Sequence, residues 1–318
     1  MTVFDGYFAD PMVLATPVEF KGRSFAYVAY GTGDPAGSTA ADNRVFEALV
    51  SNDLLSWKST GRVLDRLSAD LGNDYWAPEV AAADGAFWLY YSVGHGIGGH
   101  HIRVARSDSA LGPFKDLGLN LTPGEVFAID AHPFKDAHGR WYLFFARDVL
   151  DSPRPGTCIA VAPMKSMTEI GETVTALIPD ADWQIYERQR RIHNRILDWH
   201  TLEGPAVVAR HGRYWMTYSG GAWTGPGYAV SWAVADNPLG PWRHAPIGSA
   251  ALLATSSELR GPGHNSLATA PDGEDVIAFH SWDEKGERRQ LHINTISFEL
   301  EGPRVDGPIR GLSTTPQD

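Results

Sequence analysis

The chain has one cysteine, Cys158, among its 318 residues. A single cysteine cannot form an intramolecular disulfide, and it excludes a zinc or iron–sulfur site built from several cysteines. The chain also lacks any run of about 18 apolar residues, so no segment is predicted to cross a membrane as a helix. Acidic residues outnumber basic ones, and the net charge is −11. This balance disfavours nucleic acid or an anionic membrane as the main partner, because both select a basic surface.

Residues 1–11 contain neither a basic start nor an apolar segment, so they do not predict a secretory signal peptide. On this sequence the expected location is cytoplasmic. Hydrophobic residues make up 43% of the chain and charged residues 20%. This composition supplies a large packed core and excludes a disordered chain.

Short segments rich in Val, Tyr, Phe and Trp alternate with glycine and proline along the whole chain, which contains 33 Gly and 21 Pro. This composition favours strands over helices. One unit recurs five times: a turn that ends in glycine, followed by an aromatic-rich strand. The turn glycines are Gly22, Gly85, Gly139, Gly212 and Gly273. Each stands where a hairpin turn favours a residue with positive φ.

Each copy is followed by further strand-like segments, so the repeating unit has about four strands, and such repeats can close into a ring. No linker rich in Pro, Gly or Ser divides the chain. The sequence therefore predicts an all-β fold, a five-bladed β-propeller, formed by residues 1–318 as a single domain. Segment 183–199 departs from the repeat because it is charged and has apolar residues at roughly helical spacing. It predicts either a short helix near the mouth or a solvated surface excursion.

Residues that start the repeats share a register when they are counted back from the turn glycine. Trp76, Asp130, Glu203 and His264 each precede that glycine by nine residues. In the first copy Asp10 lies three residues before the matching position. The first strand of every propeller blade lines the central axis, so these side chains are expected to converge on one space.

Three carboxyl groups, those of Asp10, Asp130 and Glu203, would then surround one pocket. Any one of them could be a turn or loop residue, since Asp before Pro is typical of turns. Together they suggest glycoside hydrolysis. An inverting enzyme of this kind uses one carboxylic acid to protonate the leaving oxygen and one carboxylate to activate a water. A third carboxylate raises the pKa of the acid by like-charge repulsion. Glu79 lies three residues beyond the register and is interpreted as structural.

The chain resembles glycoside hydrolase family 43 in the order of five short motifs: ADP at 9–11, WAP at 76–78, IDAHP at 129–133, EGP at 203–205 and GPGHNS at 261–266. That family consists of five-bladed propellers that hydrolyse with inversion. The resemblance implies that Asp10 is the general base and Glu203 the general acid. It also implies that Asp130 tunes the pKa of Glu203 and orients the substrate.

Further roles follow from the same resemblance. It places His264 on the axis beneath the sugar, where many members of the family have a calcium ion or its water shell. Calcium is thus a candidate structural ion, and no cofactor is expected to be required. Either Arg288 or Arg289 is expected to reach the sugar, and the register does not choose between them. Trp76 is expected in the pocket because of its register. Trp223, in a Gly-rich loop, is a candidate for the rim.

Two histidine features have more than one interpretation. His132 follows the second aspartate where the family often has Pro-Ser, and it is either a pocket group or a buried, hydrogen-bonded histidine; the second is favoured. The loop at 95–101 contains His95, His100 and His101, which suggests a metal site. Its glycines favour a mobile rim loop instead.

The sequence thus predicts an inverting glycosidase that releases terminal pentose, α-L-arabinofuranose first, from plant-derived oligosaccharides. The expected partners are arabinose- or xylose-containing oligosaccharides. β-Xylosidase and endo-arabinanase activities are the alternatives within the family. A sugar-binding propeller without catalysis is the alternative from another class, and it would not need all three acids.

Overall fold

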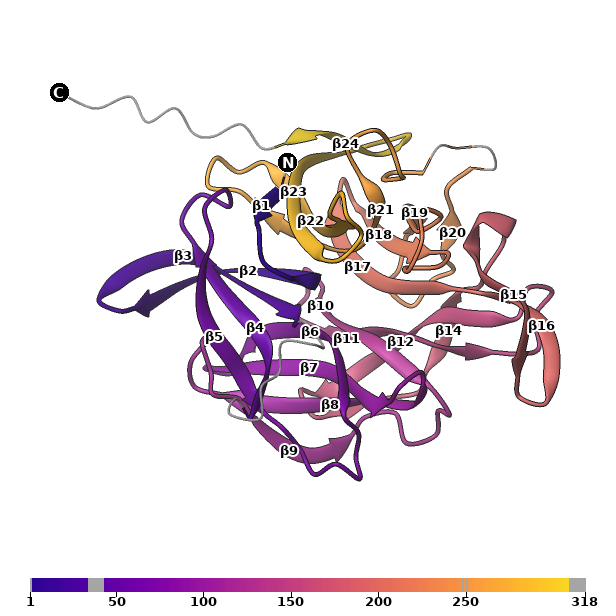
Figure 1. The fold of residues 1–318 in the computed structure, drawn as a ribbon, viewed down its shortest axis with the longest axis horizontal. Coiled ribbons are helices and arrows are strands. Elements are labelled where there is room, and N and C mark those ends of the chain that lie inside the picture. Colours follow the sequence, from indigo (N-terminus) through magenta and orange to yellow (C-terminus); the bar gives the residue numbers. More distant parts are fainter. Residues whose placement is uncertain (1, 34–42, 247–248, 250, 309–318) are drawn as a thin grey trace.

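The structure is a computed structural model, and it describes residues 2–33, 43–246, 249 and 251–308. Within these residues the chain forms five largely antiparallel sheets and one short 3-10 helix, Asp182–Gln184 (Figure 1). The predicted all-β fold is confirmed, and the sheets have a propeller-like arrangement. No helix in the described part of the chain is long and apolar enough to cross a membrane.

The sheets follow one another along the chain. The first contains β2 (Ala9–Phe20), β3 (Arg23–Thr32), β4 (Arg44–Ser51) and β5 (Lys58–Asp65). The second contains β6 (Asp74–Ala83), β7 (Ala86–His95), β8 (Gly98–Ser107) and β9 (Lys115–Asn120). The third contains β10 (Ala128–Lys135), β11 (Trp141–Val149), β12 (Gly156–Ser166), β13 (Glu169–Ile170), β14 (Val174–Leu177), β15 (Ile185–Ile192) and β16 (Arg195–His200).

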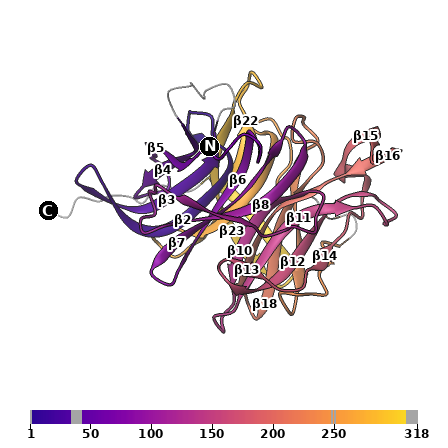
Figure 2. The same cartoon turned by 90° about the horizontal axis from the view of Figure 1, so that it is seen from below.

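The fourth sheet contains β17 (Leu202–Arg210), β18 (Arg213–Gly220), β19 (Ala229–Ala235) and β20 (Arg243–His244). The fifth contains β21 (Arg260–Thr269), β22 (Asp275–Trp282), β23 (Arg289–Glu299) and β24 (Gly302–Pro308), together with β1 (Thr2–Phe4). Figure 2, seen from below, shows strands of the second and third sheets side by side and the β15–β16 hairpin projecting at the edge.

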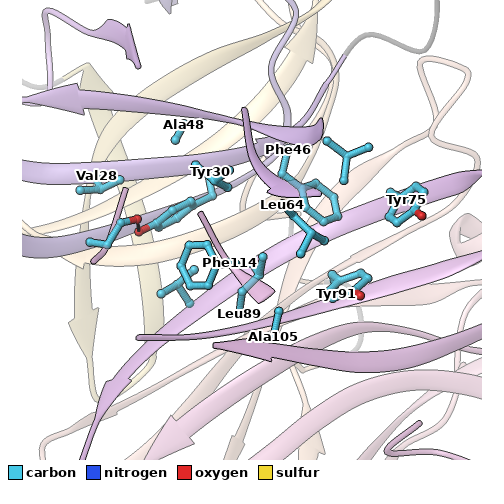
Figure 3. Packing of buried hydrophobic residues seen from close by; sticks show 14 of the residues in the cluster. Val28, Tyr30, Phe46, Ala48, Leu64, Tyr75, Leu89, Tyr91, Ala105 and Phe114 are labelled. Carbon is cyan, nitrogen blue, oxygen red and sulfur yellow. Dashed lines mark hydrogen bonds between the residues drawn. The ribbon is translucent and has the colours of Figure 1, made fainter. Parts of the chain in front are cut away.

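The innermost strands contact one another in ring order: β2, β6, β10, β17, β21 and back to β2. The N-terminal strand closes this ring, because β1 pairs with β23, with Thr2 opposite His292 (Figure 1). Apolar side chains fill the space between neighbouring sheets. Figure 3 shows one such layer, in which Phe46 of the first sheet packs against Tyr75 and Tyr91 of the second, and Tyr30 packs against Phe114.

The five turn glycines all have positive φ, as the repeat predicts. Each innermost strand also has a β-bulge, and the bulge residue has a φ between 43° and 60°. These bulge residues are Asp10, Ala77, Asp130, Gly204 and His264. The bulge therefore places the same backbone feature beside the axis in every sheet.

The bulges correct the register that was counted from the glycines. The count is right for Asp130 and His264, but Trp76 and Glu203 each stand one residue before their bulge. The reason is hairpin length: two residues separate Ala83 from Ala86, whereas five separate Lys135 from Trp141. In the first sheet a second bulge, between Ala15 and Val18, moves Asp10 further from its turn.

Segment 183–199 is not a helix beyond the 3-10 turn; it forms most of the β15–β16 hairpin. At its tip His193 and Asn194 have φ of 51° and 58°, as a type I′ hairpin turn requires. Ile196 is 59% exposed while Trp199 is buried. The apolar residues therefore do not form the single buried face that a helix would need.

Candidate active site

A cavity of about 530 Å³ lies on the inner strands, and the carboxyl groups of Asp10, Asp130 and Glu203 line it. Asp10 belongs to the first sheet, Asp130 to the third and Glu203 to the fourth. Asp10 is 8% exposed and Asp130 5% exposed. The structure thus brings together the three acids that the sequence singles out.

Asp10 lies among cationic and imidazole groups. Arg289 Nη1 donates to Asp10 Oδ1 at 3.2 Å. Nδ1 of His264 and Nδ1 of His280 lie 3.5 Å and 3.4 Å from the same oxygen. Burial by itself raises the pKa of Asp10, but Arg289, then His264 and His280, outweigh burial and hold this pKa below its usual range. Asp10 is therefore an ionised carboxylate that can accept a proton.

At Glu203 the net effect of the surroundings is to raise the pKa, whereas at Asp10 it is to lower it. Burial is the largest effect, and with the negative charge of Asp10 it raises the pKa of Glu203 to about 7. The Tyr228 hydroxyl donates to Glu203 Oε1 at 2.5 Å and opposes this rise. Glu203 therefore carries a proton at and somewhat below neutral pH, and it can donate that proton.

Asp130 completes the acidic group. Its Oδ2 accepts a hydrogen bond from the Gly204 backbone N–H at 2.9 Å. Burial, followed by the negative charges of Glu203 and Asp10, raises the pKa of Asp130 well above its usual value. Because the charge of one carboxyl group opposes ionisation of the other, Asp130 and Glu203 cannot both ionise easily near neutral pH.

Arg289 lies in an aromatic cage at the side of the cavity. Its Nε and Nη2 donate to the Tyr7 hydroxyl at 3.0 Å and 2.9 Å. Its guanidinium carbon lies 4.6 Å from the ring centroid of Trp223, which stacks on Trp282. Trp223, the candidate for the rim, is among the residues that line the cavity. Of the two candidate arginines Arg289 lines the cavity, whereas Arg288 does not line it and pairs on the surface with Asp283.

Trp76 also lines the cavity, and its ring stacks on His100 with centroids 3.6 Å apart. His100 is buried, and its Nε2 lies 2.8 Å from the Gly96 carbonyl oxygen. His100 is therefore a support for Trp76 and not part of an exposed rim. No group of three or more His, Cys, Asp or Glu side chains that could hold a metal ion occurs among the described residues.

His132 is hydrogen-bonded, as favoured, but it is only partly buried. Its Nδ1 lies 2.9 Å from Glu79 Oε2, and its Nε2 accepts the Val207 backbone N–H at 3.0 Å. The proton is therefore on Nδ1 and is donated to Glu79. This bridge joins the second, third and fourth sheets, which gives Glu79 the structural role expected of it.

His264 was expected beside a calcium ion. Its Nδ1 faces Asp10 at 3.5 Å and Asp130 at 3.7 Å. In the described residues the neighbouring Asn265 Oδ1 is buried without a hydrogen-bond partner. Calcium takes roughly six to eight oxygen ligands, and these side chains alone do not form such a cage.

Several groups at the site had no motif that marked them. Tyr228 and His280 occur in ordinary-looking strand and loop sequence and touch the acids only through the fold. Tyr7 lies three residues before Asp10, and this proximity was its one signal. The cavity continues over the first and second sheets, where it is lined by Phe46, Arg62, Arg66, Asn73, Asp74, Tyr75 and Ile97, among others.

Known proteins match this chain over most of its length. The family model for glycosyl hydrolases family 43 matches residues 27–303. A β-D-galactofuranosidase of Aspergillus niger is 30% identical over 296 residues, which covers 87% of this chain and 75% of that protein. An extracellular exo-α-(1→5)-L-arabinofuranosidase of Streptomyces chartreusis is 26% identical over 225 residues, which covers 67% of this chain and 64% of that protein.

The fold is also similar to that of a solved family-43 structure. The crystal structure of a thermostable family-43 glycoside hydrolase superimposes with a TM-score of 0.78 and 31% identity, covering 98% of this chain and 96% of that one. Asp10 precedes the span matched by the family model, so the geometry of the cavity alone places it with the other two acids. From the family match and this structural likeness together, the chain belongs to glycosyl hydrolase family 43.

Proposed function

We propose that this family-43 glycosidase is an inverting, exo-acting enzyme that releases a terminal furanose, α-L-arabinofuranose first, from plant-derived oligosaccharides. The observation that carries the proposal is the division of protonation among the buried acids. The pKa of Asp10 is held low while that of Glu203 is raised to about 7. One base and one acid are thus available together at the pH of most cells.

In the proposed reaction Glu203 gives its proton to the glycosidic oxygen as the bond from that oxygen to C1 breaks. Asp10 takes a proton from a water molecule as the water oxygen forms a bond to C1 from the opposite face. The products are a pentose of inverted anomeric configuration and a shortened oligosaccharide with a new hydroxyl group. Asp130 orients the sugar and holds negative charge beside Glu203, and Arg289 keeps Asp10 ionised.

We also take the five sheets as the five blades of one propeller, and residues 1–318 as one catalytic domain. The ring order of the inner strands supports this assignment. The part of the cavity above the first and second sheets is then the place for the leaving part of the substrate. Aromatic rings there, including Tyr75 and Phe46, offer apolar faces of the kind that stack on sugars.

A β-D-galactofuranosidase activity is the second candidate, because the relative with that name is 30% identical over 87% of this chain. β-D-Galactofuranose has the same ring configuration as α-L-arabinofuranose and a longer exocyclic group. A site that holds one therefore needs only additional room to hold the other. β-Xylosidase and endo-arabinanase activities remain alternatives to be tested with them.

The test is hydrolysis of matched aryl glycosides by the wild-type enzyme and by Glu203→Ala. The substrates are the α-L-arabinofuranoside, the β-D-galactofuranoside and the β-D-xylopyranoside, with linear arabinan as the endo substrate. Preference for the arabinofuranoside, with the first-formed sugar shown by NMR to have the inverted configuration, supports the proposal. Preference for another glycoside would change the proposed sugar but leave the proposed mechanism unchanged. A product with retained configuration would overturn the mechanism.

A further inference from the structure

Neighbouring sheets are joined by one recurring hydrogen bond at the axis. The backbone N–H of the bulge residue in one sheet donates to a side chain on the second strand of the preceding sheet. Four sheet pairs share this contact, which we call the latch. The donor and acceptor atoms are Ala77 N and Thr32 Oγ1 (2.9 Å), Asp130 N and Ser92 Oγ (3.1 Å), His264 N and Ser219 Oγ (2.7 Å), and Asp10 N and His280 Nδ1 (3.1 Å).

The four acceptors occupy one register position. Each stands opposite the residue that directly precedes a bulge, as in the pairs Ser92 with Trp76 and Ser219 with Glu203. In the third sheet the same position, opposite Ile129, holds Ala146. A methyl group cannot accept a hydrogen bond. The third sheet therefore has no latch from its second strand to the fourth sheet.

The N–H that this missing latch would hold belongs to Gly204, the bulge residue of the fourth sheet. It donates instead to Asp130 Oδ2 at 2.9 Å, which is a carboxylate on the first strand of the third sheet. Gly204 has a φ of 56°, and a Cβ there would lie 3.2 Å from the His264 ring. Both features favour glycine at this position, and its N–H directly follows Glu203 in the chain.

We propose that Ala146 is a positioning residue: by leaving the Gly204 N–H to Asp130, it places the negative charge on Asp130 and leaves the proton on Glu203. A hydrogen bond donated to a carboxyl group favours its ionised form. If one member of the pair holds the charge, the other holds the proton. This inference rests on the proposed role of Glu203 as the acid.

One substitution can offer the Gly204 N–H an acceptor other than Asp130. Ala146→Ser supplies the hydroxyl that the other sheets have at this position, and that hydroxyl would accept the Gly204 N–H in competition with Asp130. Ala146→Cys is the matched control, because its side chain is of similar size and sulfur is a weak acceptor. Ala146 is fully buried, so a simple packing effect would appear in both variants.

For Ala146→Ser we expect kcat to fall about tenfold on substrates with poor leaving groups, because a hydrogen bond to a charged group governs where the proton sits. KM should stay within about twofold, and aryl glycosides with good leaving groups should lose little, since their departure needs no acid. The alkaline limb of the pH profile should move to higher pH, because the proton now rests on the stronger base, Asp130. Ala146→Cys should resemble the wild type in all three measurements.

A measurement on the wild type does not require turnover or a folded variant. The Gly204 amide resonance is followed by NMR from pH 5 to pH 9, together with the side-chain carboxyl carbons of Asp130 and Glu203. We expect Asp130 to ionise first and the Gly204 amide to shift with it, while Glu203 keeps its proton to higher pH. If Asp130 retains the last proton, the proposal is overturned.

The outcomes separate this inference from the proposed function. If Ala146→Ser takes the Gly204 N–H in a crystal structure and leaves both the pH profile and the leaving-group dependence unchanged, the inference fails while the glycosidase remains. If the wild type hydrolyses no glycoside but Asp130 ionises before Glu203, the proposed function fails and the charge assignment stands.

Discussion

Arg289 Nη1 donates to Asp10 Oδ1 at 3.2 Å although the two residues are 279 positions apart in the chain. Asp10 lies on β2 of the first sheet and Arg289 begins β23 of the fifth. The guanidinium also binds the Tyr7 hydroxyl and faces Trp223, so its position is fixed on several sides. This pair sets the charge of the residue that we propose as the base.

Replacement of Arg289 by methionine should therefore shift the acidic limb of the pH–activity profile to higher pH. Without the guanidinium the pKa of Asp10 rises, so the base becomes protonated, and inactive, at a higher pH than in the wild type. The measurement is the pH dependence of kcat/KM on an aryl arabinofuranoside. Arg288→Met is the matched control, because Arg288 lies outside the cavity; an equal shift in both variants would contradict the assignment.

The base and the acid should respond differently to the leaving group. Asp10→Asn should lower kcat by about 10²–10⁴-fold on every substrate, since water needs its base in each case. Glu203→Gln should cause a large loss on natural oligosaccharides and a small loss on aryl glycosides with good leaving groups. The check is a plot of rate against leaving-group pKa for both variants. Equal losses for Glu203→Gln on both classes would show that Glu203 is not the acid.

Tyr228→Phe should shift the alkaline limb of the pH–activity profile to higher pH. The Tyr228 hydroxyl donates to Glu203 Oε1 and opposes the rise in its pKa, so its removal should raise that pKa further. Glu203 then keeps its proton to higher pH, by about one pH unit for the loss of a hydrogen bond to a charged group. Tyr30→Phe serves as the control, because that hydroxyl binds the Ala110 carbonyl in the core. A limb that moves to lower pH would contradict this role.

His132→Ala should lower the stability of the fold and have a smaller effect on catalysis. The imidazole bridges Glu79 and the Val207 N–H, so its loss leaves a buried carboxylate and a backbone donor without this partner. We expect a fall of about 2–3 kcal/mol in the free energy of unfolding, measured by urea denaturation. Glu79→Gln, which keeps an acceptor for Nδ1–H, should cost less. An unchanged midpoint in His132→Ala would exclude the bridging role.

Arg66 tests where the leaving part of the substrate lies. It lines the cavity on the side of the second sheet, with its guanidinium carbon 5.6 Å from the Tyr75 ring centroid. Arg66→Ala should raise KM for an oligosaccharide by about fivefold, the size expected for one lost hydrogen bond, and leave aryl glycosides unaffected. Arg106→Ala, which removes a similar arginine–aromatic contact at Trp88, is the control. Equal KM values for wild type and Arg66→Ala would place the leaving group elsewhere.

The repeat in the sequence predicted the sheets because each strand pair is local and begins at a glycine turn. It also located Asp130 and His264, whose hairpins are equally long. It misplaced the register of Trp76 and Glu203, since loop length and bulges shift residues without leaving a motif. The prediction of a helix at 183–199 was wrong, because this segment forms a hairpin and the spacing of its apolar residues does not reveal the type I′ turn at the tip.

Partners of the acids were harder to find than the acids themselves. His280 and Tyr228 look like strand or loop residues in the sequence, yet they contact Asp10 and Glu203 through the closed ring. Such contacts depend on how separate sheets are placed and not on spacing along the chain. For the same reason only the three-dimensional structure distinguishes Arg289, which lines the cavity, from Arg288.

The pairing of β1 with β23 has a consequence for biosynthesis. Asp10 leaves the ribosome well before His280 and Arg289, and the seam of the ring runs through the candidate active site. A nascent chain can already carry all three acids while the cation that fixes the charge of Asp10 is still being made. We therefore expect the proposed acid–base arrangement to form only once the fifth sheet has docked against the first.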